Sequence, residues 1–103
     1  MTKIKLDLNN LDFQQDLFSL EKNEQFALLK TLKKISQLHW EQLYMDGGLK
    51  WEEVTSKRFK SGNRLYSFRF SQKFRGIATR QGDFLKLLTL HTDHDSAYVK
   101  RTE

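Results

Sequence analysis

The second half of the chain consists of three apolar runs separated by two short polar turns, and this pattern constrains the fold most. The runs cover residues 65–70, 74–80 and 84–91 and are rich in aromatic and aliphatic side chains. The segments between them, residues 71–73 (SQK) and 81–83 (QGD), have the composition of hairpin turns. The sequence therefore predicts an antiparallel meander of three strands.

The first half predicts one strand and two helices. Apolar and polar residues alternate over residues 3–8, which is the period of a strand with one buried face. Apolar residues then recur at helical spacing over residues 13–21, after an Asn9-Asn10 pair that can cap a helix. Residues 22–24 interrupt this pattern, and residues 26–39 form a longer helical pattern. A link this short predicts that the two helices pack antiparallel.

The longer helix has a wide apolar stripe that we expect to face the core, while three lysines point elsewhere. The stripe consists of Phe26, Leu28, Leu29, Leu32, Ile35 and Leu38, and the lysines are Lys30, Lys33 and Lys34. Residues 40–44 are ambiguous between helix and strand, and residues 46–48 (DGG) indicate a turn. Residues 49–54 are a candidate fourth strand, and residues 55–63 are typical of a mobile basic loop.

This order of elements predicts an α+β fold in a single domain spanning residues 1–103. We expect an N-terminal strand and two antiparallel helices packed on one face of an antiparallel sheet of about four strands. The absence of cysteine excludes disulfides and thiolate metal sites. No apolar run reaches the roughly 20 residues that cross a bilayer, and the N-terminus lacks the pattern of a secretory signal. We therefore expect a cytoplasmic protein without a membrane partner.

Lysine and arginine outnumber aspartate and glutamate by 18 to 13, which gives a formal net charge of +5. For so short a chain this excess favours an anionic partner, either a nucleic acid or an acidic protein. Net charge also keeps proteins soluble, so charge alone does not separate these functions. The positions of the basic residues have to decide.

Two arginines are predicted to lie side by side in the first hairpin. If its loop has three residues, Phe70 faces Phe74 and Arg69 faces Arg75 across the strand pair. Adjacent guanidinium groups repel unless an anion binds between them, and each offers a planar fork of donors that suits phosphate oxygens. The alternative, which spacing alone favours, is that both arginines are solvated residues of a half-exposed sheet.

The last apolar run ends in a polar segment, residues 91–98 (HTDHDSAY), whose histidines, aspartates and tyrosine have three interpretations. A metal site ranks last because the rest of the chain offers no convincing partner ligands, and we expect no metal and no cofactor. As acid and base groups, His91 or His94 can protonate a leaving alkoxide at neutral pH, because imidazole titrates at about pH 6.5. Tyr98 can do the same or stack on a base. Alternatively, Asp93 or Asp95 caps a short C-terminal turn and Tyr98 packs on the sheet edge.

In the order of its elements and in several short motifs, nearly the whole chain resembles the RelE/ParE superfamily of toxins from bacterial toxin–antitoxin pairs. The motifs are residues 48–52 (GLKWE), the strand pair 66–70 (YSFRF) and 74–78 (FRGIA), the turn 82–83 (GD) and the ending 91–98. Each is short and degenerate. Their order and spacing in a basic chain of this length carry the resemblance.

The resemblance implies a RelE-like toxin that enters the ribosomal A site and cleaves mRNA there, which inhibits translation. The chemistry implied is metal-free attack of a ribose 2′-hydroxyl on the adjacent phosphodiester, leaving a 2′,3′-cyclic phosphate. The resemblance also implies a cognate antitoxin, whose disordered acidic segment folds over the toxin and holds it inactive.

Roles for individual residues are carried over by position. Arg75 resembles the family's phosphate-binding arginine, which would neutralise charge on the phosphorane oxygens. Glu52 lies near the place of the general base in some members. His94 or His91, with Tyr98, lies near the place of the general acid and a base-stacking aromatic. A further group would hold RNA phosphates without sequence preference: Arg69, Lys57, Arg58 and Lys60.

The chain departs from the family pattern near its end. Some RelE-like members have an arginine shortly before the final tyrosine, where this chain has Thr92, Asp93 and His94. Two aspartates also add negative charge beside the implied RNA site. These departures leave open a ParE-like alternative, in which the same fold inhibits DNA gyrase without cleaving RNA. A non-toxic interaction domain of the same fold is the third alternative.

Overall fold

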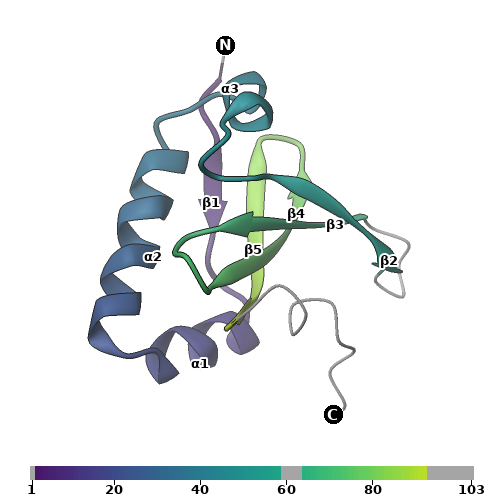
Figure 1. Ribbon diagram of the computed structural model, residues 1–103. Helices are drawn as coiled ribbons and strands as arrows, with labels where there is room; N and C mark the ends of the chain where they lie inside the picture. Colours follow the sequence, from purple (N-terminus) through teal and green to yellow (C-terminus); the bar gives the residue numbers. More distant parts are fainter. Residues whose placement is uncertain (1, 59–63, 93–103) are drawn as a thin grey trace.

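The structure is a computed structural model that describes residues 2–58 and 64–92, and Figure 1 shows how its helices and strands are arranged. The strands are β1 (Lys5–Asp7), β2 (Glu52–Arg58), β3 (Arg64–Arg69), β4 (Arg75–Gln81) and β5 (Phe84–His91), and the helices are α1 (Leu11–Ser19), α2 (Lys22–Ile35) and α3 (Trp40–Met45). These elements confirm the predicted α+β class and the three-strand meander.

The sheet has five strands in the order β1-β5-β4-β3-β2. Its last four strands are antiparallel neighbours, and the two short turns predict the β3–β4 and β4–β5 pairs. The N-terminal strand β1 lies at the edge beside β5 and runs parallel to it, with Leu6 paired to Leu85. The sheet is therefore mixed, because β1 and β5 form a parallel pair and the other three pairs are antiparallel.

Capping sets the first helix, and the break before the second lies earlier than predicted. The side chain of Asn10 accepts a hydrogen bond from the amide of Phe13 at 3.1 Å, which begins α1 as the sequence predicted. Leu20 and Glu21 have extended backbone angles, so the chain leaves the helical conformation at these two residues. Residues 22–24, predicted to interrupt the helices, instead form the first turn of α2.

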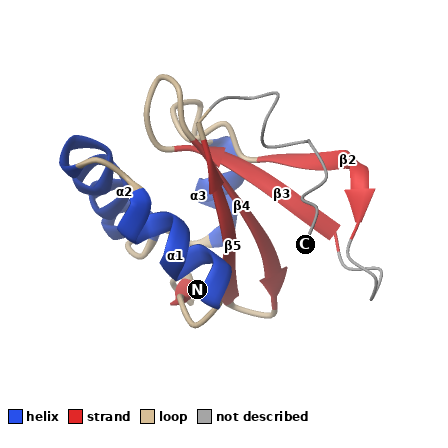
Figure 2. Cartoon of the chain, turned by 90° about the horizontal axis from the view of Figure 1, so that it is seen from below, coloured by secondary structure: helices blue, strands red, loops and turns tan. Residues whose placement is uncertain are grey.

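One face of the sheet carries the main core, and all three helices contribute to it. Figure 2 shows α1 and α2 together beside the sheet. The buried members of this core come from both layers: Ile4, Phe13, Leu28, Leu32, Ile35, Trp40, Leu43, Leu49, Trp51, Phe68, Phe70, Ala78, Leu85, Leu87 and Leu90. The core thus confirms that Phe68 and Phe70 share the face that the helices cover.

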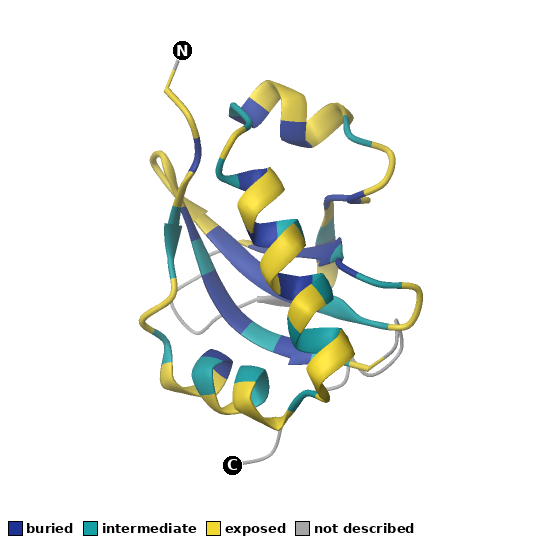
Figure 3. Ribbon diagram, turned by 90° about the vertical axis from the view of Figure 1, so that its left-hand side faces the viewer, coloured by how far each residue is buried: buried dark blue, intermediate teal, exposed yellow. Residues whose placement is uncertain are grey.

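The predicted apolar stripe of α2 is only partly in this core. Leu28, Leu32 and Ile35 are buried, whereas Phe26 is 78 % exposed and Leu29 is 53 % exposed. The prediction that the whole stripe faces the core was wrong for these two residues. Figure 3 shows the outer side of α2 turned toward the viewer as a largely exposed surface.

The structure assigns one ambiguous segment to a helix and corrects one predicted loop. Residues 40–45 form α3, where the Trp40 ring packs edge-on against Trp51 with ring centroids 5.9 Å apart. The guanidinium of Arg80 lies 4.1 Å from the centroid of the Trp40 ring. The predicted basic loop over residues 55–63 was wrong in its first half, because β2 continues to Arg58 by pairing with β3.

A second, smaller apolar cluster lies on the opposite face of the sheet. It consists of Val54, Leu65, Ile77 and Leu88, each between 3 % and 9 % exposed. Ile77 pairs with Ser67 in the strand register, whereas its chain neighbour Gly76 pairs with Phe68 of the main core. Because successive side chains alternate between faces, the two clusters lie on opposite sides of the same strands.

Candidate functional site

Three basic side chains form a row across the sheet, at the end where the β3–β4 hairpin turns. Arg69 of β3 pairs with Arg75 of β4, and Arg75 pairs with His91 of β5. Directly paired residues of antiparallel strands have Cβ atoms about 5 Å apart on the same face. The row is therefore about 10 Å long, with Arg75 at its centre. The predicted pairing of the two arginines is confirmed.

The row lies on the sheet face opposite the helices, called the open face below. The neighbouring row of the same strands, Phe68, Gly76 and Leu90, points the other way, into the main core. A Cβ atom added to Gly76 would lie 2.4 Å from the Phe68 ring, so glycine is required for this close approach. Arg69, Arg75 and His91 are all partly exposed.

A β-bulge in β5 puts the imidazole on this face. The register with β4 shifts by one residue at Leu88. Leu85 and Leu87 face the main core, and strict alternation from them would point His91 to the same side. The extra residue reverses the phase of the strand, so His91 lies beside Arg75 instead.

Neither arginine of the row has a carboxylate partner among the described residues. Arg69 Nε donates to the carbonyl oxygen of Ser71 and Arg75 Nη1 to that of Phe74, both at 3.3 Å. The ion pairs in the described part of the chain are Lys34 with Asp46 and Arg64 with Glu53. Each guanidinium carries five N–H donors, so most of its donor capacity is available to a ligand.

The end of β5 is held from two sides. Thr89 Oγ1 lies 2.9 Å from His91 Nε2, which links the imidazole to the next side chain on its own face. Asp16 of α1 accepts a hydrogen bond from the amide of Leu90 at 2.9 Å. β1 reaches only as far along β5 as Lys86, so Asp16 satisfies a backbone donor that has no strand partner there. Sequence reasoning missed Asp16, whose helical position gives no sign of this contact.

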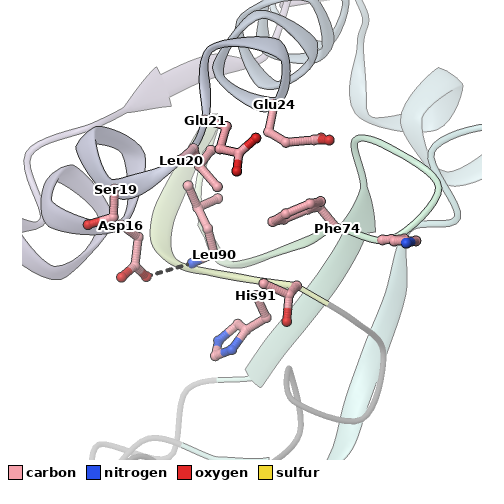
Figure 4. Close-up of a pocket in the computed structure, with 10 residues that line it drawn as sticks. Asp16, Ser19, Leu20, Glu21, Glu24, Phe74, Leu90 and His91 are labelled. Atoms are coloured by element: carbon pink, nitrogen blue, oxygen red, sulfur yellow. Dashed lines mark hydrogen bonds between the residues drawn. The ribbon is translucent and has the colours of Figure 1, made fainter.

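A cleft of about 450 Å³ opens between the α1–α2 link and the end of β5 (Figure 4). Its lining residues are Asp16, Ser19, Leu20, Glu21, Glu24, Lys73, Phe74, Leu90, His91 and Thr92. The Oε1 atom of Glu24 is buried and has no hydrogen-bond partner among the described residues. Figure 4 shows the His91 ring turned away from Glu21 and Glu24, so the carboxylates and the imidazole do not form one cluster. The two arginines of the row do not line the cleft.

Glu52 lies on the open face, but at a distance from His91. It pairs with Ser67, one row away from the arginines, and it is exposed. Three strand spacings of about 4.8 Å separate the backbone of β2 from that of β5, or about 14 Å in total. The arginine pair lies between the two strands. A base at Glu52 and an acid at His91 could therefore reach the same phosphate only if that phosphate is bound at the arginine pair, between β2 and β5.

The remaining predicted site residues are placed only in part. Lys57 and Arg58 belong to β2, and Arg58 pairs with Arg64 in the strand register. Lys60, His94 and Tyr98 lie outside the described residues, as do Asp93, Asp95 and the predicted C-terminal turn. Across residues 2–58 and 64–92, no group of three or more histidine, aspartate and glutamate side chains is placed to hold a metal ion.

Within the described part of the chain, no helix has both the length and the apolar character needed to span a bilayer.

No protein-family model matches the sequence, and no curated protein matches it. A search of solved structures found a copper-bound point mutant of a toxin from Helicobacter pylori, with a TM-score of 0.52 and 19 % sequence identity. The match covers 90 % of this chain and 97 % of that toxin. The two chains share a fold.

At this level of identity the likeness concerns the fold alone, and it covers 90 % of this chain. A protein of known structure therefore has the same α+β architecture. The likeness leaves the RelE/ParE assignment and the roles of individual residues as predictions, because residue-level correspondence does not follow from a shared fold.

Proposed function

We propose that this protein is a RelE-like toxin that cleaves mRNA on the ribosome and is neutralised by an antitoxin. The observation that carries the proposal is the row Arg69–Arg75–His91, in which two guanidinium groups without a carboxylate partner among the described residues lie beside an imidazole on the open face. The fold shared with a toxin, the basic net charge and the RelE/ParE resemblance support the same assignment.

Each member of the row has a chemical role in this proposal. Arg75, at the centre, binds the scissile phosphate and neutralises the charge that develops on its oxygens, and Arg69 holds the same or the neighbouring phosphate. His91 donates a proton to the departing 5′-oxygen while a ribose 2′-hydroxyl attacks phosphorus. The bond from phosphorus to the 5′-oxygen breaks, and a 2′,3′-cyclic phosphate remains on the upstream fragment.

The other predicted site residues complete the proposal from a greater distance. Glu52 removes the proton of the 2′-hydroxyl, and His94 or Tyr98 remains the alternative proton donor to His91. Lys57, Arg58 and Lys60 hold the RNA backbone through phosphate contacts that carry no sequence information. Because the substrate is ribosome-bound mRNA, the proposal also places the protein in the cytoplasm.

The test is to add the purified protein to a translating extract that contains end-labelled mRNA, and to map new ends together with their phosphate chemistry. We expect cuts spaced by codons that bear 2′,3′-cyclic phosphate and that disappear when ribosomes are omitted. Intact mRNA under active translation would overturn the nuclease proposal. Inhibition of DNA gyrase in a parallel supercoiling assay would then favour the ParE-like alternative, and inactivity in both assays would favour the interaction domain.

A further inference from the structure

Helix α2 has two apolar faces, and the core covers only one of them. Leu28 and Leu32 are at most 4 % exposed, whereas Phe26 and Leu29 are 78 % and 53 % exposed on the outer side. Single exposed apolar residues are common on protein surfaces. Here, however, two large ones are neighbours at a spacing of three residues along one helix, which gives a continuous apolar strip.

The strip forms the floor of a shallow groove of about 330 Å³ lined by Phe26, Leu29, Lys30 and Lys33. These positions are i, i+3, i+4 and i+7 of α2, so the groove follows the helix axis over about two turns. Figure 3 shows this side of α2 facing outward, away from the sheet. A second helix packing along α2 would fit such a groove, because side-chain ridges at these spacings interdigitate between helices.

The charges beside the groove are all positive. Lys30 and Lys33 take part in neither of the ion pairs in the described part of the chain, whereas the adjacent Lys34 is paired with Asp46 at 2.9 Å. An apolar floor flanked by these two ammonium groups complements a ligand that has apolar side chains between carboxylates.

We propose that this groove binds an amphipathic, acidic helix of a partner protein, whose apolar side chains pack against Phe26 and Leu29 and whose carboxylates lie beside Lys30 and Lys33. The inference rests on the antitoxin part of the proposed function, for which it names the docking surface, and it does not depend on the nuclease part. The groove lies on the helix layer and the Arg69–Arg75–His91 row on the open face, so a helix docked here leaves the row uncovered. Binding through α2 and inhibition of the site are therefore separable.

The test uses a fluorescein-labelled helical peptide of about five turns, with leucines on one face flanked by glutamates. Its affinity for the full chain is measured by fluorescence anisotropy, and its location is mapped by amide chemical-shift changes. We expect saturable binding, with shifts centred on residues 26–33. A matched peptide with lysine in place of each glutamate should bind at least about tenfold more weakly.

Two variants form the matched pair for this test. Phe26→Ala should weaken binding by about tenfold or more, because a central aromatic anchor is lost. Phe18→Ala removes a phenylalanine of similar exposure, 76 %, from α1, which does not line the groove, and should leave binding unchanged. Since both side chains are exposed, both variants should keep the thermal stability of the parent and its mRNA cleavage.

Several results would overturn the inference. These are absence of binding by the acidic peptide at millimolar concentration, equal binding of both peptides, shifts centred on another element, or equal effects of the two alanine variants. A dimer of the chain that dissociates on Phe26→Ala would assign the groove to a second copy. Binding to anionic lipid vesicles that Phe26→Ala abolishes, without peptide binding, would assign it to a membrane surface.

Discussion

The same strands form both faces of the sheet, but the two faces carry different kinds of side chains. On the face covered by the helices, Phe68 and its neighbours form one large apolar cluster. On the open face, a small apolar cluster around Ile77 lies next to the row Arg69–Arg75–His91. The alternation of side chains along each strand makes this division possible. Residues that hold the fold together and residues available to a ligand are thus chain neighbours on opposite faces, which allows each set to be changed separately.

The first and largest expected effect concerns the unequal weight of the two clusters. Phe68 is fully buried in the main core, and Phe68→Ala should lower the free energy of unfolding by about 3–5 kcal/mol. Ile77 belongs to the four-residue cluster of the open face, and Ile77→Ala should cost about 2 kcal/mol, at the low end for such a truncation. Urea unfolding of both variants measures the difference. Equal losses would mean that the open-face cluster contributes as much per side chain as the main core.

The second prediction compares two arginines of β4 on opposite faces. Arg75→Ala should reduce mRNA cleavage by about 10³-fold, the effect of removing a group that neutralises transition-state charge. Its stability should change by no more than about 0.5 kcal/mol, because among the described residues the Arg75 side chain bonds only to the carbonyl oxygen of Phe74. Arg80 lies against the Trp40 ring and donates to the hydroxyl of Tyr44 at 3.1 Å.

Arg80→Ala is therefore the control, with the opposite profile. It should lower stability by about 1 kcal/mol through the lost ring and hydroxyl contacts, and leave cleavage by the folded fraction intact. Cleavage assays normalised to folded protein, with thermal unfolding of each variant, separate the two effects. A folded Arg75→Ala protein that still cleaves would remove the row from the proposed site.

The third prediction concerns the imidazole of the row. His91→Ala should slow cleavage by at least about 10²-fold, as expected for loss of a general acid. His39 precedes α3 and is not part of the row. Its backbone amide donates to Gln42 Oε1 at 2.9 Å, a bond that alanine keeps, so His39→Ala should leave cleavage unchanged. Single-turnover cleavage on stalled ribosomes measures both rates. Normal cleavage by His91→Ala would transfer the proton-donor role to His94 or Tyr98.

The pairing of the arginines could be predicted from the sequence, but the position of His91 could not. A three-residue loop fixes the register of the β3–β4 hairpin, so Arg69 and Arg75 follow from local spacing. The bulge at Leu88 reverses the alternation in β5, and nothing in the leucine-rich run indicates which residue is extra. The neighbour relation of Arg75 and His91 therefore required the three-dimensional structure.

The helices show a similar division. The cap at Asn10 and the apolar periodicity predicted that α1 and α2 exist. Periodicity could not show that Leu28 is buried and Phe26 exposed. An apolar stripe that is too wide to be covered completely has the same sequence pattern as one that is fully buried. The parallel pairing of β1 with β5 was also out of reach, since a three-residue strand carries no signal for its partner.

The fourth and smallest effect concerns the turn through which the chain passes from the helix layer into the sheet. Asp46 Oδ1 accepts from the amides of Gly48 and Leu49, and Oδ2 pairs with Lys34 Nζ at 2.9 Å. The hydrogen bond from Lys34, helped by the two amides and opposed by burial, lowers the pKa of the Asp46 carboxyl below its ordinary value of 3.8. The half-exposed lysine limits the energy gained, so Asp46→Asn should cost about 1 kcal/mol at neutral pH.

The sign of the pH dependence follows from the direction of this shift. A carboxyl whose pKa is lower in the folded state contributes its full stability above pH 3.8, and this contribution falls as the pH drops through the lower folded value. The stability difference between the parent and Asp46→Asn should therefore shrink in acid. Asp83→Asn, at an exposed turn position, is the control and should change stability by no more than about 0.5 kcal/mol at neutral pH. Urea unfolding at about pH 7 and about pH 3 tests this, because a difference that persists in acid would come from turn geometry rather than from the charge on Asp46.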